Sequence, residues 1–269
     1  TGHYARIVQG PNGPQLHRGI DEAKDQSYVL AIMGPQELPR VIFPLGEAPS
    51  KAWVRSEAER MGLGGSNKTD SYDICFIPDG DTQGFLKSHL GSKPGEIVDT
   101  DGQVVGRHEG YWNFTVGQRR GLNLGNPAAD GRPRYVVETR PETNQVIVGA
   151  SELLSVDRIT CSDIVWLAGD DPGEVDDAAT RTFGASIGER SLGEVDERVL
   201  TAQIRAHGMP SVVTTLQRFG EDEGKLELCL ALPIRGVAAG QSMVLYRGTR
   251  VIAEATIERA HRGEGSTGS

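Results

Sequence analysis

The pattern of apolar and polar positions changes near Pro78. Before this proline, three short runs rich in apolar and β-branched residues are expected to be strands: "TGHYARI" at 1–7, "RVIFPLG" at 40–46 and "DSYDICFI" at 70–77. The second run is expected to be buried and to end at Pro44, because proline cannot donate a hydrogen bond to a neighbouring strand.

Two helices are expected among these strands. "SKAWVRSEAERMGL" at 50–63 is the clearest, with Ser50 as a candidate N-cap and Gly62 as its stop. The second half of "LHRGIDEAKDQSYVLAIM" at 16–33 is also expected to be helical, with Asp21 as a candidate cap. Strands that alternate with helices predict the end of an α/β domain.

After Pro78 the chain is expected to be mostly β-structure. One short helix is predicted at 82–90, and from there short β-rich runs alternate with turns; the links "TDG" and "RPETN" are hairpin signals. Strands at this spacing predict small β-barrels. The stretch 169–197 is acidic and glycine-rich with few large apolar residues, so we expect a long, partly disordered loop.

The pattern predicts three domains. They are an α/β remnant at 1–82, a small β-rich central domain at 83–152 and a C-terminal β-barrel at 153–264 that contains the acidic loop.

Composition is typical of a soluble globular chain, with 37% hydrophobic and 24% charged residues among 269. The net charge of −9 is uneven: residues 1–135 carry −1 (15 basic against 16 acidic) and residues 136–269 carry −8 (13 against 21). This balance weakens the case for a protein that coats nucleic acid but leaves room for a local basic patch. No apolar run is long enough to span a membrane, and no secretory leader is visible. Because the first residue is Thr1, we expect a processed product or one piece of a longer protein.

The three cysteines are too few and too scattered for a disulfide framework, and none has metal-ligand spacing. We therefore expect no metal site and a reducing, cytoplasmic location. Cys161 and Cys229 lie in β-rich runs and are expected to be structural. Cys75 leaves two interpretations open: a buried strand cysteine, or a reactive thiol at a strand end whose pKa is lowered by nearby cations or amides.

A second candidate site is the stretch "GRHEGYWNFTVGQRRGL" at 106–122. Glycines bracket Arg119 and Arg120, which suits phosphate contacts from a tight loop, and the preceding aromatic residues could stack on bases. A solvated hairpin tip above an aromatic core explains the same residues equally well. His3 and the segment Lys24-Asp25-Gln26 are further polar clusters, each with a purely structural alternative. No Walker loop, GxGxxG or catalytic triad is present, which argues against a complete nucleotide enzyme in this chain.

Six segments stand in a fixed order: "TGHYAR", "LHRGIDEAKDQSYVL", "FPLGEAPSKAWVRSEAERMGL", "KTDSYDICFI", "PGEIVDTDGQVVGRHEGYWNFTVGQRRGL" and "AAGQSMVLY". In this order they resemble the tRNA-specific 2-thiouridylases. The resemblance runs from Thr1 to about Glu258 and is dense up to Leu122. Its most specific part is "DICFI" followed by "FTVGQRRGL".

The resemblance implies that residues 1–82 are the C-terminal part of an adenine-nucleotide α-hydrolase-like domain. It also implies a reaction: ATP, with Mg²⁺ expected, adenylates the carbon-2 oxygen of the wobble uridine of tRNA, and a cysteine persulfide then delivers sulfur to carbon 2. A second cysteine forms a disulfide with the first and releases the sulfur onto the base. The implied partners are tRNA and a persulfide donor protein, with no membrane.

Carried over by position, Cys75 matches the persulfide-bearing cysteine and Gly2 a backbone contact to ATP. The positions matching tRNA contacts are His3, Lys24, Asp25, Gln26, Arg205 and Gln241, and Arg119 and Arg120 are expected near the tRNA. Arg205 is followed by Ala206 where the family has an aromatic residue.

The family's Ser-Gly-Gly-Val-Asp-Ser-type ATP loop and its first cysteine are absent from this sequence. The chain thus resembles the C-terminal two-thirds of a thiouridylase and is expected to be inactive alone, with a second chain covering the open part of its α/β sheet. Two alternatives stay open: a non-catalytic tRNA-binding module, and an unrelated α/β protein with a structural Cys75.

Overall fold

The computed structural model describes residues 1–64, 81–124, 130–167, 175–185, 187, 191–221 and 224–262. These residues form two compact units, which are treated separately below. The first unit comprises the described residues of Thr1–Asn67, Asp157–Pro233 and Ala239–Ser269, and the second those of Lys68–Val156 with Ile234–Ala238. The expected strand at 70–77, and Cys75 with it, lie outside the described residues.

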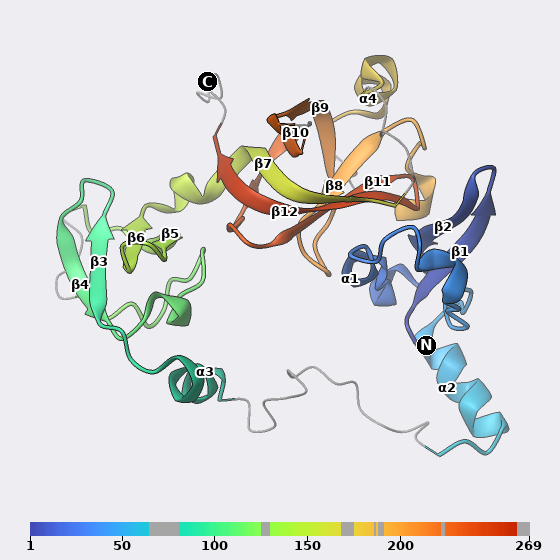
Figure 1. The fold of residues 1–269 in the computed structure, drawn as a ribbon, viewed down its shortest axis with the longest axis horizontal. Coiled ribbons are helices and arrows are strands. Elements are labelled where there is room, and N and C mark those ends of the chain that lie inside the picture. Colours follow the sequence, from blue (N-terminus) through green and yellow to red (C-terminus); the bar gives the residue numbers. More distant parts are fainter. Residues whose placement is uncertain are drawn as a thin grey trace. The chain divides into compact units, whose positions relative to one another are not determined.

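An eight-stranded antiparallel sheet organises the first unit (Figure 1). Its strands, in spatial order, are β1 (Ala5–Gly10), β2 (Gly13–Arg18), β12 (Arg250–His261), β11 (Ser242–Arg247), β8 (Leu200–Gln203), β9 (Ser211–Phe219), β10 (Lys225–Arg235) and β7 (Ser155–Trp166). A further pairing of β12 with β7 closes the last six strands into a barrel. The predicted C-terminal β-barrel is therefore confirmed.

The β1–β2 hairpin continues the sheet of this barrel. His17 of β2 pairs with Arg250 of β12, and the Arg18 amide donates to the Thr249 carbonyl at 2.9 Å. One apolar core serves both parts, because Leu16, Leu38 and Phe43 from the N-terminal segment pack in the same cluster as Val244 and Val251 from the barrel. The first unit is therefore built from both ends of the chain.

The expected strand at 40–46 is wrong. This stretch follows a 3-10 helix, Leu38–Arg40, and runs through turns in which the Gly46 amide donates to the Phe43 carbonyl at 3.1 Å. Pro39 and Pro44 lack the amide hydrogens that a ladder would need, and of the apolar side chains in this stretch only Phe43 is buried, whereas Ile42 is 75% exposed.

Helix α2 (Lys51–Arg60) confirms the clearest helix of the sequence. The Ser50 hydroxyl accepts a hydrogen bond from the Trp53 amide at 3.1 Å, and Gly62, with φ of 69°, follows its end. No residue of α2, all of which the structure describes, is buried. Asp21 does not cap the 3-10 turn that follows it through its side chain; its carboxylate instead accepts from the Lys51 amide at the start of α2, at 2.9 Å.

The remaining N-terminal helical turns are short: η1 (Glu22–Lys24) and α1 (Ser27–Leu30). The helix expected in the second half of 16–33 is thus divided between them. None of the described helices is long and apolar enough to cross a membrane.

The acidic stretch 169–197 is more ordered than expected where the structure describes it. Helix α4 (Asp177–Phe183) and the 3-10 turn η5 (Leu192–Glu194) form within it. Ala179, Ile187 and Val195 are buried against Val199 and Val212 of the barrel. The few small and β-branched apolar residues of this stretch are sufficient to fix it to the core, although its composition resembles that of a loop.

The second unit contains a four-stranded sheet with the order β4-β3-β6-β5, in which β3 and β6 are parallel. Its elements are α3 (Thr82–Leu90), β3 (Gly95–Asp99), β4 (Val104–His108), η3 (Tyr111–Asn113), β5 (Tyr135–Arg140), β6 (Gln145–Gly149) and η4 (Ser151–Leu154). The helix predicted at 82–90 and the two predicted hairpins are confirmed. Gly102 and Asn144 adopt the left-handed conformation that those turns require.

Candidate functional site

Arg18, at the end of β2, is the centre of the first unit's polar site. Only 2% of its surface is exposed. One guanidinium nitrogen donates to Asp25 Oδ2 at 3.0 Å, and the other donates to Gln203 Oε1 at 2.8 Å. The guanidinium carbon lies 3.6 Å from the centre of the Tyr246 ring. A buried cation needs such partners, and the planar guanidinium can serve all three at once.

The carboxylate of Asp25 is fully engaged by its surroundings. Oδ1 accepts from the Gly19 and Ser27 amides, both at 3.0 Å, and Oδ2 accepts from the Ser27 hydroxyl at 2.8 Å as well as from Arg18. The Ser27 hydroxyl is also 3.2 Å from the hydroxyl of Tyr246, whose pKa is raised by burial. Asp25 is therefore placed to hold the Lys24–Ser27 segment in shape.

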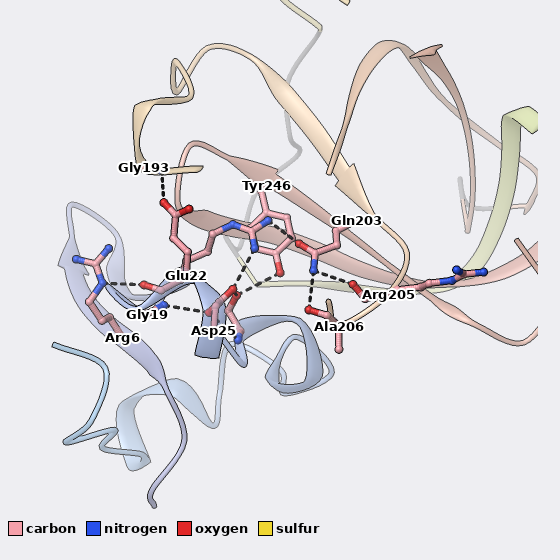
Figure 2. Close-up of polar contacts among 11 residues, drawn as sticks. Arg6, Gly19, Glu22, Asp25, Gly193, Gln203, Arg205, Ala206 and Tyr246 are labelled. Atoms are coloured by element: carbon pink, nitrogen blue, oxygen red, sulfur yellow. Dashed lines mark hydrogen bonds and ion pairs between the residues drawn. The ribbon is translucent and has the colours of Figure 1, made fainter. Parts of the chain in front are cut away.

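Gln203, at the end of β8, links Arg18 and its partner Asp25 to the loop that follows β8 (Figure 2). Its Nε2 donates to the carbonyls of Arg205 and Ala206 at 2.8 and 3.2 Å. The Arg205 side chain is exposed and extends away from the polar network in Figure 2. The predicted positions Asp25 and Arg205, far apart in sequence, are thus joined through Arg18 and Gln203.

Gln26 and the residue after Gln241 each contact the N-terminal segment of the first unit. Gln26 forms two hydrogen bonds with Tyr4. Its side-chain Oε1 accepts from the Tyr4 backbone amide at 3.0 Å, and its backbone amide donates to the Tyr4 carbonyl at 2.8 Å. The Tyr28 hydroxyl donates to the carbonyl of Ser242, the residue after Gln241, at 2.8 Å. Burial raises the pKa of Tyr28, and the cation of Arg205 opposes that rise.

The remaining predicted positions of the first unit lie at its N-terminal end. His3 Nδ1 lies 2.6 Å from the Thr1 hydroxyl, and its ring meets Phe43 edge-on at 6.2 Å. Lys24 is partly exposed at the end of η1. Gly2 is exposed, and a Cβ there would make only an ordinary contact with Leu45. Among the described residues, Gly2 is therefore open and not tightly enclosed.

A pocket of ≈ 550 Å³ opens beside the network. Arg18 and Asp25 line one part of it, and the 206–209 loop lines another. Glu22 closes the rim: its carboxylate accepts hydrogen bonds from the Ser191 hydroxyl and, at 3.2 Å, from the Gly193 amide. The acidic stretch is thereby fastened next to the Lys24–Gln26 segment.

Arg119 and Arg120 lie in the second unit, in a loop held to β5. The Gly117 amide donates to the Val136 carbonyl at 2.8 Å, and the Val136 amide donates to the Gln118 carbonyl at 2.9 Å. Both arginine side chains are exposed, and neither forms an ion pair with another described residue. A fixed loop that presents two exposed cations suits contacts to phosphate groups.

The two described cysteines are structural in character. Cys161 is buried in β7, and burial raises its pKa to about 12, so it is a thiol at neutral pH. Cys229 is half-buried in β10. No cluster of three His, Cys, Asp or Glu side chains suited to a metal ion occurs in the part of the chain that the structure describes.

Sequence reasoning missed Arg18, Gln203 and Tyr246, which hold the site together. Arg18 stands inside the recognised segment "LHRGIDEAKDQSYVL", but nothing local marks it as buried. Its partner Gln203 is 185 positions away along the chain. Only the pairing of β2 with the barrel reveals this contact.

Three protein families match successive parts of the chain. Residues 1–79 match the family described as "tRNA methyl transferase HUP domain", residues 83–150 the "tRNA methyl transferase PRC-barrel domain", and residues 189–257 the "Aminomethyltransferase beta-barrel domain". Together with the structure, these matches confirm the predicted fold class: part of an α/β domain, a small β-rich middle part and a C-terminal β-barrel.

Curated relatives resemble nearly the whole chain. A protein of Beutenbergia cavernae is 53% identical over 97% of this chain and 63% of its own length. Proteins of Kocuria rhizophila and Micrococcus luteus are 49% and 47% identical over 97% of this chain and over 66% and 65% of their own lengths. All three are named tRNA-specific 2-thiouridylase MnmA, and the chain spans a little under two-thirds of each. By this similarity, the chain belongs to the tRNA-specific 2-thiouridylase family.

Proposed function

We propose that this chain supplies the tRNA-binding and sulfur-carrying part of a tRNA-specific 2-thiouridylase. The observation that carries the proposal is the convergence of three separate segments on Arg18. The Lys24–Gln26 segment reaches Arg18 through Asp25, the loop that carries Arg205 reaches it through Gln203, and β11, the strand that follows Gln241, reaches it through Tyr246. In the proposal they form one tRNA-binding surface, to which His3 also contributes.

The names of the relatives favour sulfur transfer over methyl transfer. Two of the three matching families are described as tRNA methyl transferases, whereas the relatives are named thiouridylases. We follow the relatives, because they are about half identical over 97% of the chain, whereas each family match covers one section of it. Both sets of names agree on tRNA as the substrate class.

Cys75 is proposed to carry the transferred sulfur as a persulfide. Its terminal sulfur forms the new bond to carbon 2 of the wobble uridine, and the S–S bond then breaks when a second cysteine takes Cys75 into a disulfide. ATP is proposed as the co-substrate that converts the carbon-2 oxygen into a leaving group, and Mg²⁺ is expected to accompany it. The backbone of Gly2 is expected to contact the ATP. Because the chain spans a little under two-thirds of its relatives, the reaction is proposed for a protein of the relatives' full length.

In this proposal the second unit adds phosphate contacts from Arg119 and Arg120. A persulfide donor protein supplies the sulfur, and a second chain or further segment completes the α/β domain. The division at 1–82, 83–152 and 153–264 is retained as the domain proposal. A cytoplasmic location follows from the proposed substrate.

Nucleoside analysis tests the proposal directly. The full-length protein is incubated with ATP, a persulfide donor and cognate tRNA, and the digested tRNA is examined by mass spectrometry for 2-thiouridine. We expect product from the unmodified protein and from Cys229→Ser, and none from Cys75→Ser. Absence of product would contradict the proposal. Salt-dependent tRNA binding without product would instead favour the non-catalytic binding module, and absence of both binding and product would contradict both roles.

A further inference from the structure

The side-chain amide of Gln203 is buried between Arg18 and the loop that carries Arg205, and Arg18 in turn is bonded to Asp25 of the Lys24–Gln26 segment. Only 3% of the residue is exposed. On one side Arg18 donates to its oxygen at 2.8 Å, and on the other its nitrogen donates to the Arg205 and Ala206 carbonyls. The amide thus bridges Arg18 of β2 and the backbone of the Arg205 loop.

Chemistry fixes the orientation of this amide. A guanidinium has only donors, so the Gln203 oxygen must face Arg18. Backbone carbonyls have only acceptors, so the NH₂ group must face Arg205 and Ala206. The reversed amide would lose all three hydrogen bonds, with its NH₂ group against the Arg18 donor and its oxygen against the two carbonyl oxygens. Gln203 is therefore locked in one orientation by partners on both sides.

The loop that Gln203 holds is a tight turn. The Arg205 carbonyl also accepts from the Gly208 amide at 3.0 Å. A Cβ at Gly208 would lie 3.3 Å from the Cβ of Arg205, closer than most such contacts. The direction of the exposed Arg205 side chain thus depends on a backbone carbonyl held by two donors, one from the turn itself and one from Gln203.

We propose that Gln203 is a positioning residue for tRNA binding and that it acts through Arg205. Its hydrogen bonds link the buried Arg18–Asp25 pair to the 205–208 turn. Arg205 is thereby held in a fixed position relative to the Lys24–Gln26 segment. This inference rests on the proposed function, because it assigns Gln203 to the same tRNA-binding surface.

A double-mutant cycle on the full-length protein tests the inference. Affinity for cognate tRNA is measured for Gln203→Leu, Arg205→Ala and the double variant. We expect each single variant to bind about tenfold more weakly, since the loss of one or two buried hydrogen bonds or a phosphate contact has this size. The double variant should bind no more weakly than Arg205→Ala alone.

Two further variants separate positioning from general stability. Gln203→Glu keeps an acceptor for Arg18 but loses the donors to the turn, so it should reproduce the weak binding of Gln203→Leu even if the leucine variant folds poorly. Thr201→Val, on the same strand and 2% exposed, is the matched control and should bind tRNA like the unmodified protein. Circular dichroism at the binding temperature checks that every variant is folded.

The outcomes are distinct. If Gln203→Leu weakens binding equally in the presence and absence of Arg205, the residue acts on the fold as a whole and the inference fails. The inference also fails if Arg205→Ala binds normally, while the proposed function stands as long as the unmodified protein binds and thiolates tRNA. If the unmodified protein neither binds nor thiolates tRNA, both the proposed function and the inference fall.

Discussion

The guanidinium of Arg18 lies 3.6 Å from the centre of the Tyr246 ring, and both side chains are withdrawn from solvent. Arg18 comes from the N-terminal hairpin and Tyr246 from the barrel, so the stack joins two regions that are remote in sequence. A cation on an aromatic face is stabilised by the ring quadrupole, and more strongly where water is excluded. The contact therefore contributes both to the stability of the first unit and to the geometry of the proposed site.

Replacing Arg18 should strongly destabilise the first unit. Arg18→Met leaves the Asp25 carboxylate buried without its cation, and breaking a buried ion pair in this way costs about 3–5 kcal/mol of unfolding free energy. Urea denaturation followed by fluorescence measures the change. Arg198→Ala removes an exposed arginine paired with Asp196 and should leave the midpoint nearly unchanged. Equal effects of the two variants would contradict the role given to Arg18.

His17 should make the first unit less stable in acid. Burial, with Arg6 and Arg250 nearby, lowers its pKa from 6.5 to about 4. Between these values the unfolded chain binds a proton that the folded chain does not, so stability should fall as the pH drops from about 6.5 to about 4. The effect is measured as the midpoint of thermal unfolding against pH.

His17→Gln should reduce this pH dependence, because glutamine does not titrate. His261→Gln, which changes an exposed histidine at the end of β12, serves as the control and should retain the full slope. If the His17 variant keeps the same slope as the unmodified protein, then other groups cause the acid sensitivity.

Replacing Arg119 and Arg120 should weaken tRNA binding and reduce the dependence of the affinity on salt concentration. Each phosphate contact releases counterions, so the double alanine variant should lower the slope of log affinity against log salt by up to ~2. Its thermal stability should be unchanged, since both side chains are exposed. Arg140→Ala, in the same unit but paired with Glu138, should leave the slope unchanged. A slope that stays constant in the double variant would remove these arginines from the interface.

Cys161 should resist thiol reagents in the folded protein. Its burial and raised pKa of about 12 leave almost no thiolate at neutral pH. Labelling with a maleimide, followed by mass spectrometry of peptides, should show Cys161 modified only after denaturation. Rapid modification at neutral pH would mean that β7 opens readily.

Local signals in the sequence were sufficient for the elements whose hydrogen bonds join residues close in sequence, such as α2 and the hairpins of the second unit. Ser50 and Gly62 mark the ends of α2 because capping and left-handed backbone are properties of single residues. The hairpins of the second unit follow from their turn residues for the same reason. The strand expected at 40–46 is wrong because apolar content decides neither the backbone geometry nor the burial of each residue: this stretch forms turns, Phe43 is buried and Ile42 is exposed.

The centre of the candidate site was beyond the reach of local reasoning. Lys24-Asp25-Gln26 stood out through a family resemblance, but the sequence did not indicate that Asp25 is buried or that Gln26 is bonded to Tyr4. These facts depend on the β1–β2 hairpin joining the barrel sheet. A contact such as that between Arg18 and Gln203 has no signature in either segment alone.

The sharing of one sheet by both ends of the chain bears on how the protein is made. His17 is hydrogen-bonded to Thr249, 232 positions later. During synthesis the hairpin therefore emerges long before β12, its partner in the sheet, and the first unit can be completed only when nearly all of the described chain has left the ribosome. The four strands of the second unit lie within 95–149 and can pair earlier. The edge of β2 that pairs with β12 therefore stays unpaired until β12 has been synthesised, and an unpaired strand edge is a template for association with other chains.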